Sequence, residues 1–382
     1  MGYNSNVVLC KNEVLIEGVS VGQFESFTLK ADRRTLGATA VLTIPLYAIG
    51  VETPTSKGEA KARVRQTLLT DDRKLLIKPC AQVEVYCWYD GYDKIKVFSG
   101  YIEHIAEGFP SVLYLRDGSF ILRFGAIKNA WSGDVTLRQI TDKCIDVAWS
   151  AFKDERKKQG LTRSVPKLVY STSGKNVQAV TTPISFDNFA SGRSPFEIIQ
   201  YLMQLLVLYA GVDNDNNFYI GAGVADTTRE VAKLSTKYNV ISRNITPTDG
   251  RFVDYDVKVT GVLKSGKKFT ATGGIKNTRS AESSSALDKL TGESYRGYSL
   301  ANTEKGIQET ADRLLAKLKG TYNKGTITLL LYPKCQVLDH VDYDDTVFNI
   351  FDAKYYVTGY SLTCNERGYF QTLEVTDRVF ML

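Results

Sequence analysis

Histidine is scarce in this chain of 382 residues, and cysteine never clusters. There are only two histidines, His104 and His340, so the three protein ligands of a zinc hydrolase site are hard to assemble. The six cysteines are scattered and no two have a Cys-x-x-Cys spacing, which argues against a zinc ribbon or a redox motif. We expect them to be buried free thiols in strands. His104 follows Glu103 with no nucleophile near it in the sequence, so we expect it to be structural or solvent-facing.

Motifs for phosphate binding and nucleophilic catalysis are also missing. The glycines at 221–223 and 273–274 are not followed by a Gly-Lys-Ser/Thr signature, and no Gly-x-Ser-x-Gly is present. No apolar run reaches the roughly 20 residues of a membrane-spanning helix. Residues 1–6 lack the basic and apolar stretches of a secretory signal. The sequence therefore predicts no catalytic residues, no cofactor, no membrane insertion and folding in a cytoplasm.

Two polar stretches are candidate metal sites. His340 lies in the acidic stretch 339–345, where clustered carboxylates could bind a divalent metal, but a turn-rich acidic loop between strands is the favoured interpretation. Residues 213–217 resemble the start of a calcium loop, yet Phe218 and Val224 stand where Gly and Glu are required. A hairpin turn accounts better for that stretch. No metal site is predicted, with the acidic stretch left open.

Strands dominate the pattern that is present. Residues 38–46 and 82–88 alternate apolar and polar side chains in period two, as half-buried strands do. Residues 94–105 begin with the same alternation and change phase near Gly100, as a β-bulge would require. Residues 111–124 predict a further hairpin that turns at Asp117-Gly118. Short strands separated by turns indicate a sandwich or a small barrel.

Three helices interrupt the strands. Thr136 caps a run of apolar residues at helical spacing, which ends at Gly160. Residues 194–197 (Ser-Pro-Phe-Glu) form a capping box with proline at the first helical position. A third helix is predicted at 303–319. Three further strands follow it, at 326–332, 355–364 and 369–377. The fold class is therefore mainly β with an α+β middle, and the similar plans of the first and last thirds allow two related barrels.

One long connection, residues 49–79, is basic. Loops of this length in compact domains are usually functional or disordered. The stretch from 57 to 74 has no aromatic residue, which argues against base stacking, and a net charge of +6 for the chain does not identify a nucleic-acid binder. We expect a solvated face or a contact with an acidic partner surface. Its cations are Lys57, Lys61, Arg63, Arg65, Arg73 and Lys74.

The order of elements is similar to that of a known family. Residues 98–103 (FSGYIE) lead to 113–117 (LYLRD) and then to a helix after 131–137 (WSGDVTL). Near the end, a strand at 329–333 precedes a turn at 337–342. A strand at 355–360 and a closing hairpin at 367–373 complete the series.

This series resembles the baseplate or tail hub proteins of tailed phages and contractile injection systems, the group that includes the base of type VI secretion spikes. The turn departs from the family pattern, because His340-Val341-Asp342 stands where Pro-Gly-Asp is usual. The resemblance implies two tail-tube-like antiparallel β-barrels and a small α/β domain. The implied boundaries are 1–128 for the first barrel with its loop 49–79, 129–245 for the middle domain, and 246–382 for the second barrel with helix 303–319.

The resemblance also implies a structural function. Such hubs form a homotrimeric ring that adapts a sixfold tail tube to a threefold spike or fibre and lets a tape-measure protein and then DNA pass. The chain would belong to a virion tail assembled in the bacterial host cytoplasm, and its basic loop would dock on the neighbouring tube ring. Two alternatives stay open: a tail-associated cell-wall hydrolase and a receptor- or carbohydrate-binding tail protein. No paired carboxylates or Cys/His set supports the hydrolase.

Overall fold

The computed structural model describes most of the chain in separate stretches. These are residues 9–45, 77–106, 111–128, 131, 134–171, 177–178, 184–185, 191–206, 208–223, 232–249, 254–263, 265, 267–273, 292–299, 303–318, 321–346, 351 and 353–377. The mainly β fold class with a smaller helical part is confirmed. Among the described helices, none is both long and apolar enough to span a membrane.

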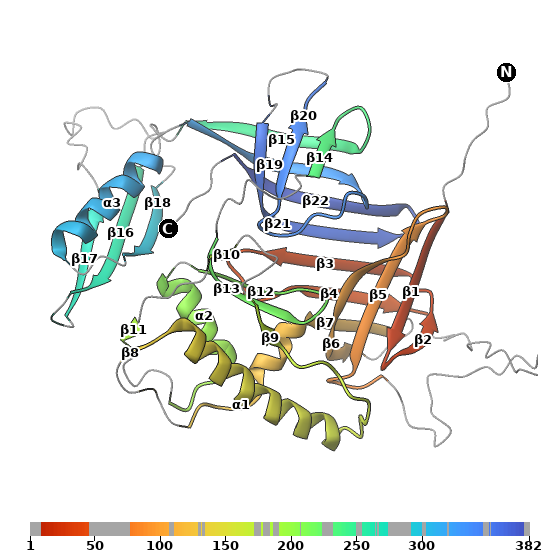
Figure 1. The fold of residues 1–382 in the computed structure, drawn as a ribbon. Coiled ribbons are helices and arrows are strands. Elements are labelled where there is room, and N and C mark those ends of the chain that lie inside the picture. Colours follow the sequence, from red (N-terminus) through yellow and green to blue (C-terminus); the bar gives the residue numbers. More distant parts are fainter. Residues whose placement is uncertain are drawn as a thin grey trace, which may run out of the picture.

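A sheet of 13 strands runs through both ends of the chain (Figure 1). We call its N-terminal part the first barrel and its C-terminal part the second barrel. The first barrel contains β1 (Cys10–Ile16), β2 (Val19–Gly22), β3 (Ser26–Asp32), β4 (Thr39–Ile44), β5 (Gln82–Tyr89), β6 (Ile95–Ala106) and β7 (Ser111–Asp117). The second barrel contains β14 (Ala232–Ser235), β15 (Val240–Asp249), β19 (Thr321–Leu330), β20 (His340–Asp344), β21 (Ala353–Asn365) and β22 (Gly368–Thr376). Each barrel encloses its own apolar core.

The middle of the chain forms a helical layer beside the first barrel (Figure 1). Its apolar core joins helices, short strands and the side chain of Tyr101 from β6. The predicted caps are confirmed: Thr136 and Gln139 form a capping box, as do Ser194 and Glu197. The elements are η1 (Gly118–Arg123), β8 (Asp134–Val135), α1 (Leu137–Lys158), β9 (Val169–Tyr170), β10 (Val177–Gln178), β11 (Ile184–Ser185), α2 (Pro195–Leu206), β12 (Tyr209–Val212) and β13 (Asn217–Gly223).

A separate three-stranded sheet interrupts the second barrel between β15 and β19. It consists of β16 (Asp254–Val262), β17 (Lys268–Gly273) and β18 (Gly292–Tyr298), and α3 (Glu304–Leu318) packs on it. The predicted third helix is thus present. Val257 and Ala271 on the strands face Ile307 and Leu314 on α3, which forms a core distinct from that of the barrel.

Two local predictions were wrong. The hairpin expected at 111–124 is a strand followed by the 3₁₀ helix η1, because the Asp117 side chain accepts a hydrogen bond from Ser119 N and caps that helix. The acidic stretch 339–345 is mostly the strand β20, paired with β21, instead of a loop. Two register shifts of β6 flank Gly100, where a bulge was expected. One lies between Lys96 and Phe98 in the pairing with β5, and the other between Ile102 and His104 in the pairing with β7.

The two barrels repeat one strand order. Five strands correspond, in the order β3-β4-β7-β6-β5 in the first barrel and β15-β19-β22-β21-β20 in the second. The next strand differs in direction, because β1 runs antiparallel to β5 whereas β14 runs parallel to β20. The bulge repeats as well, because β21 shifts register against β22 between Val357 and Gly359, as β6 shifts against β7 between Ile102 and His104. Aligning the bulges makes Ile102 equivalent to Val357, and both are buried.

The repeat extends to the backbone conformation before β5 and β20. Cys80 and Leu338 both adopt positive φ, 67° and 72°, which is uncommon for residues other than glycine. The N–H of each donates to the carbonyl just before the bulge, Ile102 at 2.8 Å and Val357 at 2.9 Å. The same hydrogen-bonded corner therefore opens both strands, although the sequences there differ.

The alignment holds across neighbouring strands. Leu115 in β7 and Val375 in β22 pair with the residues just before the two bulges and are buried. Following the strand pairs outward, Leu115 pairs with Ala40 and Ala40 with Leu29 in β3, whereas Val375 pairs with Gly325 and Gly325 with Ile245 in β15. Leu29 and Ile245 are therefore equivalent, and both are buried. The barrels are thus structural duplicates without a recognisable sequence repeat.

Candidate functional site at the barrel junction

The two barrels are joined by direct strand pairing. β21 of the second barrel runs antiparallel to β3 of the first, from the Gly359–Asp32 pair to the Cys364–Phe27 pair. Arg33 N extends the ladder by donating to Thr358 O at 3.0 Å. Segments more than 300 residues apart thereby form one continuous sheet (Figure 1).

Behind this pairing, the core of the first barrel includes residues from both ends of the chain. The Sγ atoms of Cys87 on β5 and Cys364 on β21 lie 3.7 Å apart, and both side chains are fully buried. Burial raises the pKa of the Cys364 thiol, so it stays protonated. Tyr89 donates its hydroxyl to Tyr369 O at 3.0 Å, and burial raises the pKa of Tyr89 to about 12. The junction is therefore neutral and closely packed.

A buried amide fixes the chain where β19 leaves the sheet. Gln371 donates its Nε2 to Leu331 O at 2.6 Å and to Pro333 O at 2.9 Å. Its Oε1 accepts from Cys335 N at 3.1 Å. All three bonds go to backbone groups, so this side chain holds the connection to β20 in place.

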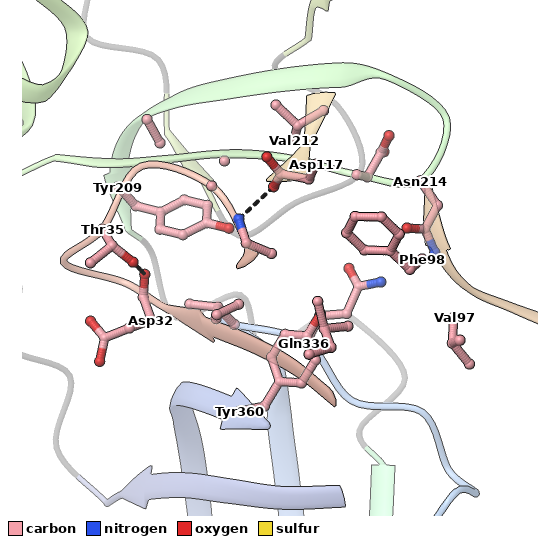
Figure 2. Close-up of a pocket in the computed structure, with 18 residues that line it drawn as sticks. Asp32, Thr35, Val97, Phe98, Asp117, Tyr209, Val212, Asn214, Gln336 and Tyr360 are labelled. Carbon is pink, nitrogen blue, oxygen red and sulfur yellow. Dashed lines mark hydrogen bonds between the residues drawn. The ribbon is translucent and has the colours of Figure 1, made fainter. Parts of the chain in front are cut away.

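A small cavity lies where both barrels meet the helical layer (Figure 2). Its volume is about 50 Å³, with Asp117, Tyr209, Gln336 and Tyr360 among its lining residues. Small-molecule pockets usually measure about 300–1,000 Å³, so this cavity has room only for water. Asp117 accepts from Ala38 N at 2.7 Å and from Ser119 N at 3.0 Å, and burial raises its pKa. The carboxylate is occupied by structural bonds.

A buried ion pair joins the helical layer to the first barrel. Arg156 of α1 donates to both carboxylate oxygens of Glu17, each at 2.9 Å. It also donates to Cys80 O at 2.6 Å and to Arg163 O at 2.9 Å. The side chains of Arg156 and Glu17 are 4% and 7% exposed. Because the pair is bidentate and fully hydrogen-bonded, it can offset the cost of burying two charges.

The two histidines lie apart on different barrels. His104 is exposed on β6 with its ring 5.8 Å from Tyr114, and neighbouring Glu103 is engaged by Arg116 at 2.8 Å and Arg123 at 2.6 Å. His340 packs edge-on against Tyr356 with ring centroids 4.4 Å apart. Each histidine ring thus packs against a tyrosine of its own barrel.

The predicted hairpin turn at 213–217 is confirmed between β12 and β13. Both Asp213 oxygens are occupied: Oδ1 accepts from Asp215 N and Asn217 N, and Oδ2 from Asn217 Nδ2 and the Tyr219 hydroxyl. Burial alone would raise the pKa of Asp213, but these hydrogen bonds outweigh it and lower the pKa. Within the stretches that the structure describes, no three His, Cys, Asp or Glu side chains are grouped as metal ligands.

The proposed docking loop lies outside the described residues. This applies to each of its named cations, Lys57, Lys61, Arg63, Arg65, Arg73 and Lys74. The Arg156–Glu17 pair was not predicted, because no local sequence pattern links residues that lie 139 positions apart. The pairing of β3 with β21 was missed for the same reason.

Comparisons with known proteins support the fold. No protein-family model and no curated protein sequence matches the chain. Among solved structures, a tail protein from Neisseria meningitidis MC58 matches with a TM-score of 0.56 and 14% identity, over 97% of each chain. The 43 kDa tail protein of prophage MuSo2 from Shewanella oneidensis matches with 0.55 and 14%, over 96% of this chain and 98% of that one.

A chain of the Francisella PdpA–VgrG complex matches with a TM-score of 0.50 and 11% identity, over 99% of this chain and 59% of that chain. The resemblance to tail proteins inferred from the sequence is confirmed at the level of the fold. The chain shares its fold with the tail proteins of Neisseria meningitidis MC58 and of prophage MuSo2.

Proposed function

We propose that this chain is a structural hub subunit of a phage-type tail. Three copies form a ring that adapts a sixfold tail tube to a threefold spike or central fibre. The tape-measure protein, and then DNA, pass through its lumen. Its place is the virion tail, assembled in the bacterial host cytoplasm, and its partners are copies of itself, the tube protein and the spike.

The duplication of the barrel is the observation that supports this proposal most directly. One chain supplies two barrels of the same strand order, joined side by side in one sheet. Three such chains supply six similar barrels while keeping threefold symmetry. A ring closed by head-to-tail contacts can therefore match a sixfold partner on one side and a threefold partner on the other.

The proposed division of the chain follows this plan. The division expected from the sequence is 1–128 for the first barrel, 129–245 for the helical domain and 246–382 for the second barrel with its inserted sheet and α3. Because β14 and β15 pair with β20 and β19, we propose that the second barrel also includes these two strands. The helical domain packs against the first barrel through the Arg156–Glu17 pair, which orients the two parts. We propose that the chain acts through these interfaces and not through catalysis.

Light scattering and negative-stain imaging of the full chain test the proposal. We expect a mass of three chains and a threefold ring with a central channel, either alone or with the tube protein present. A particle that remains a monomer under all assembly conditions would refute the hub. A glycan array separates the hub from a carbohydrate-binding tail protein, which would bind defined sugars.

A further inference from the structure

The in-chain junction leaves two complementary strand edges open, one in each barrel. β15 is the equivalent of β3, and its outer side has no strand partner in the described part of the chain. β6 is the equivalent of β21, and β5 covers it only as far as Ile102. The next residues of β6, 103–106, correspond to residues 358–361 of β21. Within the chain, residues 359–361 pair with β3, and Thr358 O accepts from the N–H of Arg33, which directly follows β3. Along the described stretches, that side of 103–106 faces no strand.

We propose that the outer edge of β15 pairs with residues 103–106 of β6 in a second copy of this chain, repeating the junction between β3 and β21. The inference rests on the proposed function, because it names the surfaces by which hub subunits join. Each chain offers one edge of each kind, so the contact is head-to-tail and satisfies every edge only when the chains close into a ring.

A second copy of the chain is the expected partner because the β3–β21 junction within the chain already joins two edges of these kinds. The β6 edge has the same bulge and the same hydrogen-bonded corner as the β21 edge. β15 pairs with β19 in the same register as β3 pairs with β4, so the two outer edges present equivalent residues. Long open edges invite pairing with other chains, and a complementary edge on the next copy removes that liability.

The start of β15, outside the stretch that would face 103–106, exposes apolar side chains. Tyr238 is 74% exposed and Ile241 is 53% exposed, in the turn before the strand and within it. Leu330, whose N–H donates to Asn239 O, is 39% exposed beside them.

Proline at position 247 limits the contact. The N–H of Arg33 donates to β21 across the in-chain junction. Because backbone N–H groups of alternate residues point to the same side of a strand, the N–H of Ala31 also points toward β21. The equivalent of Ala31 is Pro247, which has no N–H. The ladder between chains therefore has one hydrogen bond fewer, and the edge is less open to indiscriminate pairing.

The repeat fixes the register that an experiment can test. Within the chain, Lys30 faces Ser361 as a pair that exchanges no backbone hydrogen bonds. Their equivalents are Thr246 and Ala106, so these two should face each other between copies. Such pairs have Cα atoms about 4.5 Å apart, within the range that a disulfide spans.

The test is the double variant Thr246→Cys, Ala106→Cys in the full chain, oxidised with copper–phenanthroline. Two thiols give one disulfide with loss of two protons, and the two electrons pass to copper(II). We expect covalent dimers and trimers on a non-reducing gel, reversed by reductant. Neither single variant should form them. The offset control Asn244→Cys, Ala106→Cys should form several-fold less, because shifting the pair by two residues opens the gap to about 7–8 Å.

The outcomes separate the two proposals. If the double variant forms rings but gives no more disulfide-linked dimer and trimer than the offset control, the assignment of the two edges is wrong while the proposed hub function stands. A monomer under all assembly conditions would overturn both. Hydrogen exchange of the wild-type protein needs no variant. The amides of Asp249 and Ile105 are the ones that donate across the proposed contact, by equivalence with Arg33 and Tyr360 in the chain. Both should exchange at least ten-fold more slowly in the ring than in dilute monomer. Equal exchange would also overturn the edge assignment.

Discussion

The first and second barrels share a frame but differ in what covers it. At equivalent positions before the bulge, Tyr101 is buried against Phe120 and Phe152 of the helical layer, whereas Tyr356 is half-buried against His340. The strand order, the bulge and the left-handed corner recur because they determine how the sheet curls. The outward faces have diverged because each barrel has a different neighbour.

The insertions differ as well. The first barrel has its long connection between β4 and β5, whereas the equivalent connection between β19 and β20 spans only residues 331–339. The second barrel instead has β16–β18 and α3 between β15 and β19, where the first has a short turn. Each duplicate therefore has its longest insertion at a different place in the same frame.

The largest expected effect concerns the contact that only the first barrel makes. Arg156→Ala leaves the Glu17 carboxylate buried without its partner, so we expect the free energy of unfolding to fall by about 3–5 kcal/mol in urea titrations. Arg138→Ala is the matched control on the same helix. Its pair with Asp142 is exposed, and its loss should cost about 0.3–0.5 kcal/mol. Equal losses for the two variants would contradict the role assigned to Arg156.

The next prediction concerns a position where the two barrels break their equivalence. A Cβ at Gly100 would lie 2.1 Å from Arg116 O, whereas the equivalent residue in the second barrel is the buried Tyr355. Gly100→Ala should destabilise the fold by about 2 kcal/mol or more, since the β6–β7 ladder must shift. Gly91→Ala, at φ +83° with open space around it, should cost only about 1 kcal/mol. Thermal unfolding measures both, and a neutral Gly100→Ala would show that the ladder yields freely.

For a single thiol and a single pH unit, a smaller effect is expected from alkaline pH. Burial raises the pKa of Cys80 in the first barrel to about 11, and that of Cys335 in the second and Cys144 in α1 to about 12. Unfolded thiols ionise near pH 8.5. Because the folded values are raised, the stabilisation is complete below about pH 8.5 and is lost as the pH rises toward the folded values.

The expected loss is about 1.4 kcal/mol per pH unit for each thiol. Urea titrations at several alkaline pH values measure the slope. Cys335→Ala should reduce it by one thiol's share, as should Cys144→Ala. A slope unchanged by either substitution would mean that other groups determine the alkaline loss.

The sequence was informative where structure is local. Period-two alternation located the strands, and the cap residues Thr136 and Ser194 located the starts of two helices. Asp117-Gly118 misled because aspartate before glycine suits both a hairpin and a helix cap, and only the apolar core beneath η1 decides between them. The pairing of β3 with β21 depends on tertiary packing, so no local pattern could reveal it.

The smallest expected effect on stability comes from the insertion specific to the first barrel. Deleting residues 57–74 removes Lys57, Lys61, Arg63, Arg65, Arg73 and Lys74. The free energy of unfolding should change by only about 0.6 kcal/mol, because shortening a long loop changes its closure entropy slowly. Docking on the tube protein, measured by co-sedimentation, should nevertheless be lost. Replacing the same six cations by Gln is the matched control. Loss of docking in that variant as well would show that the positive charges make the contact. If docking survives the deletion, residues 57–74 do not dock on the tube protein.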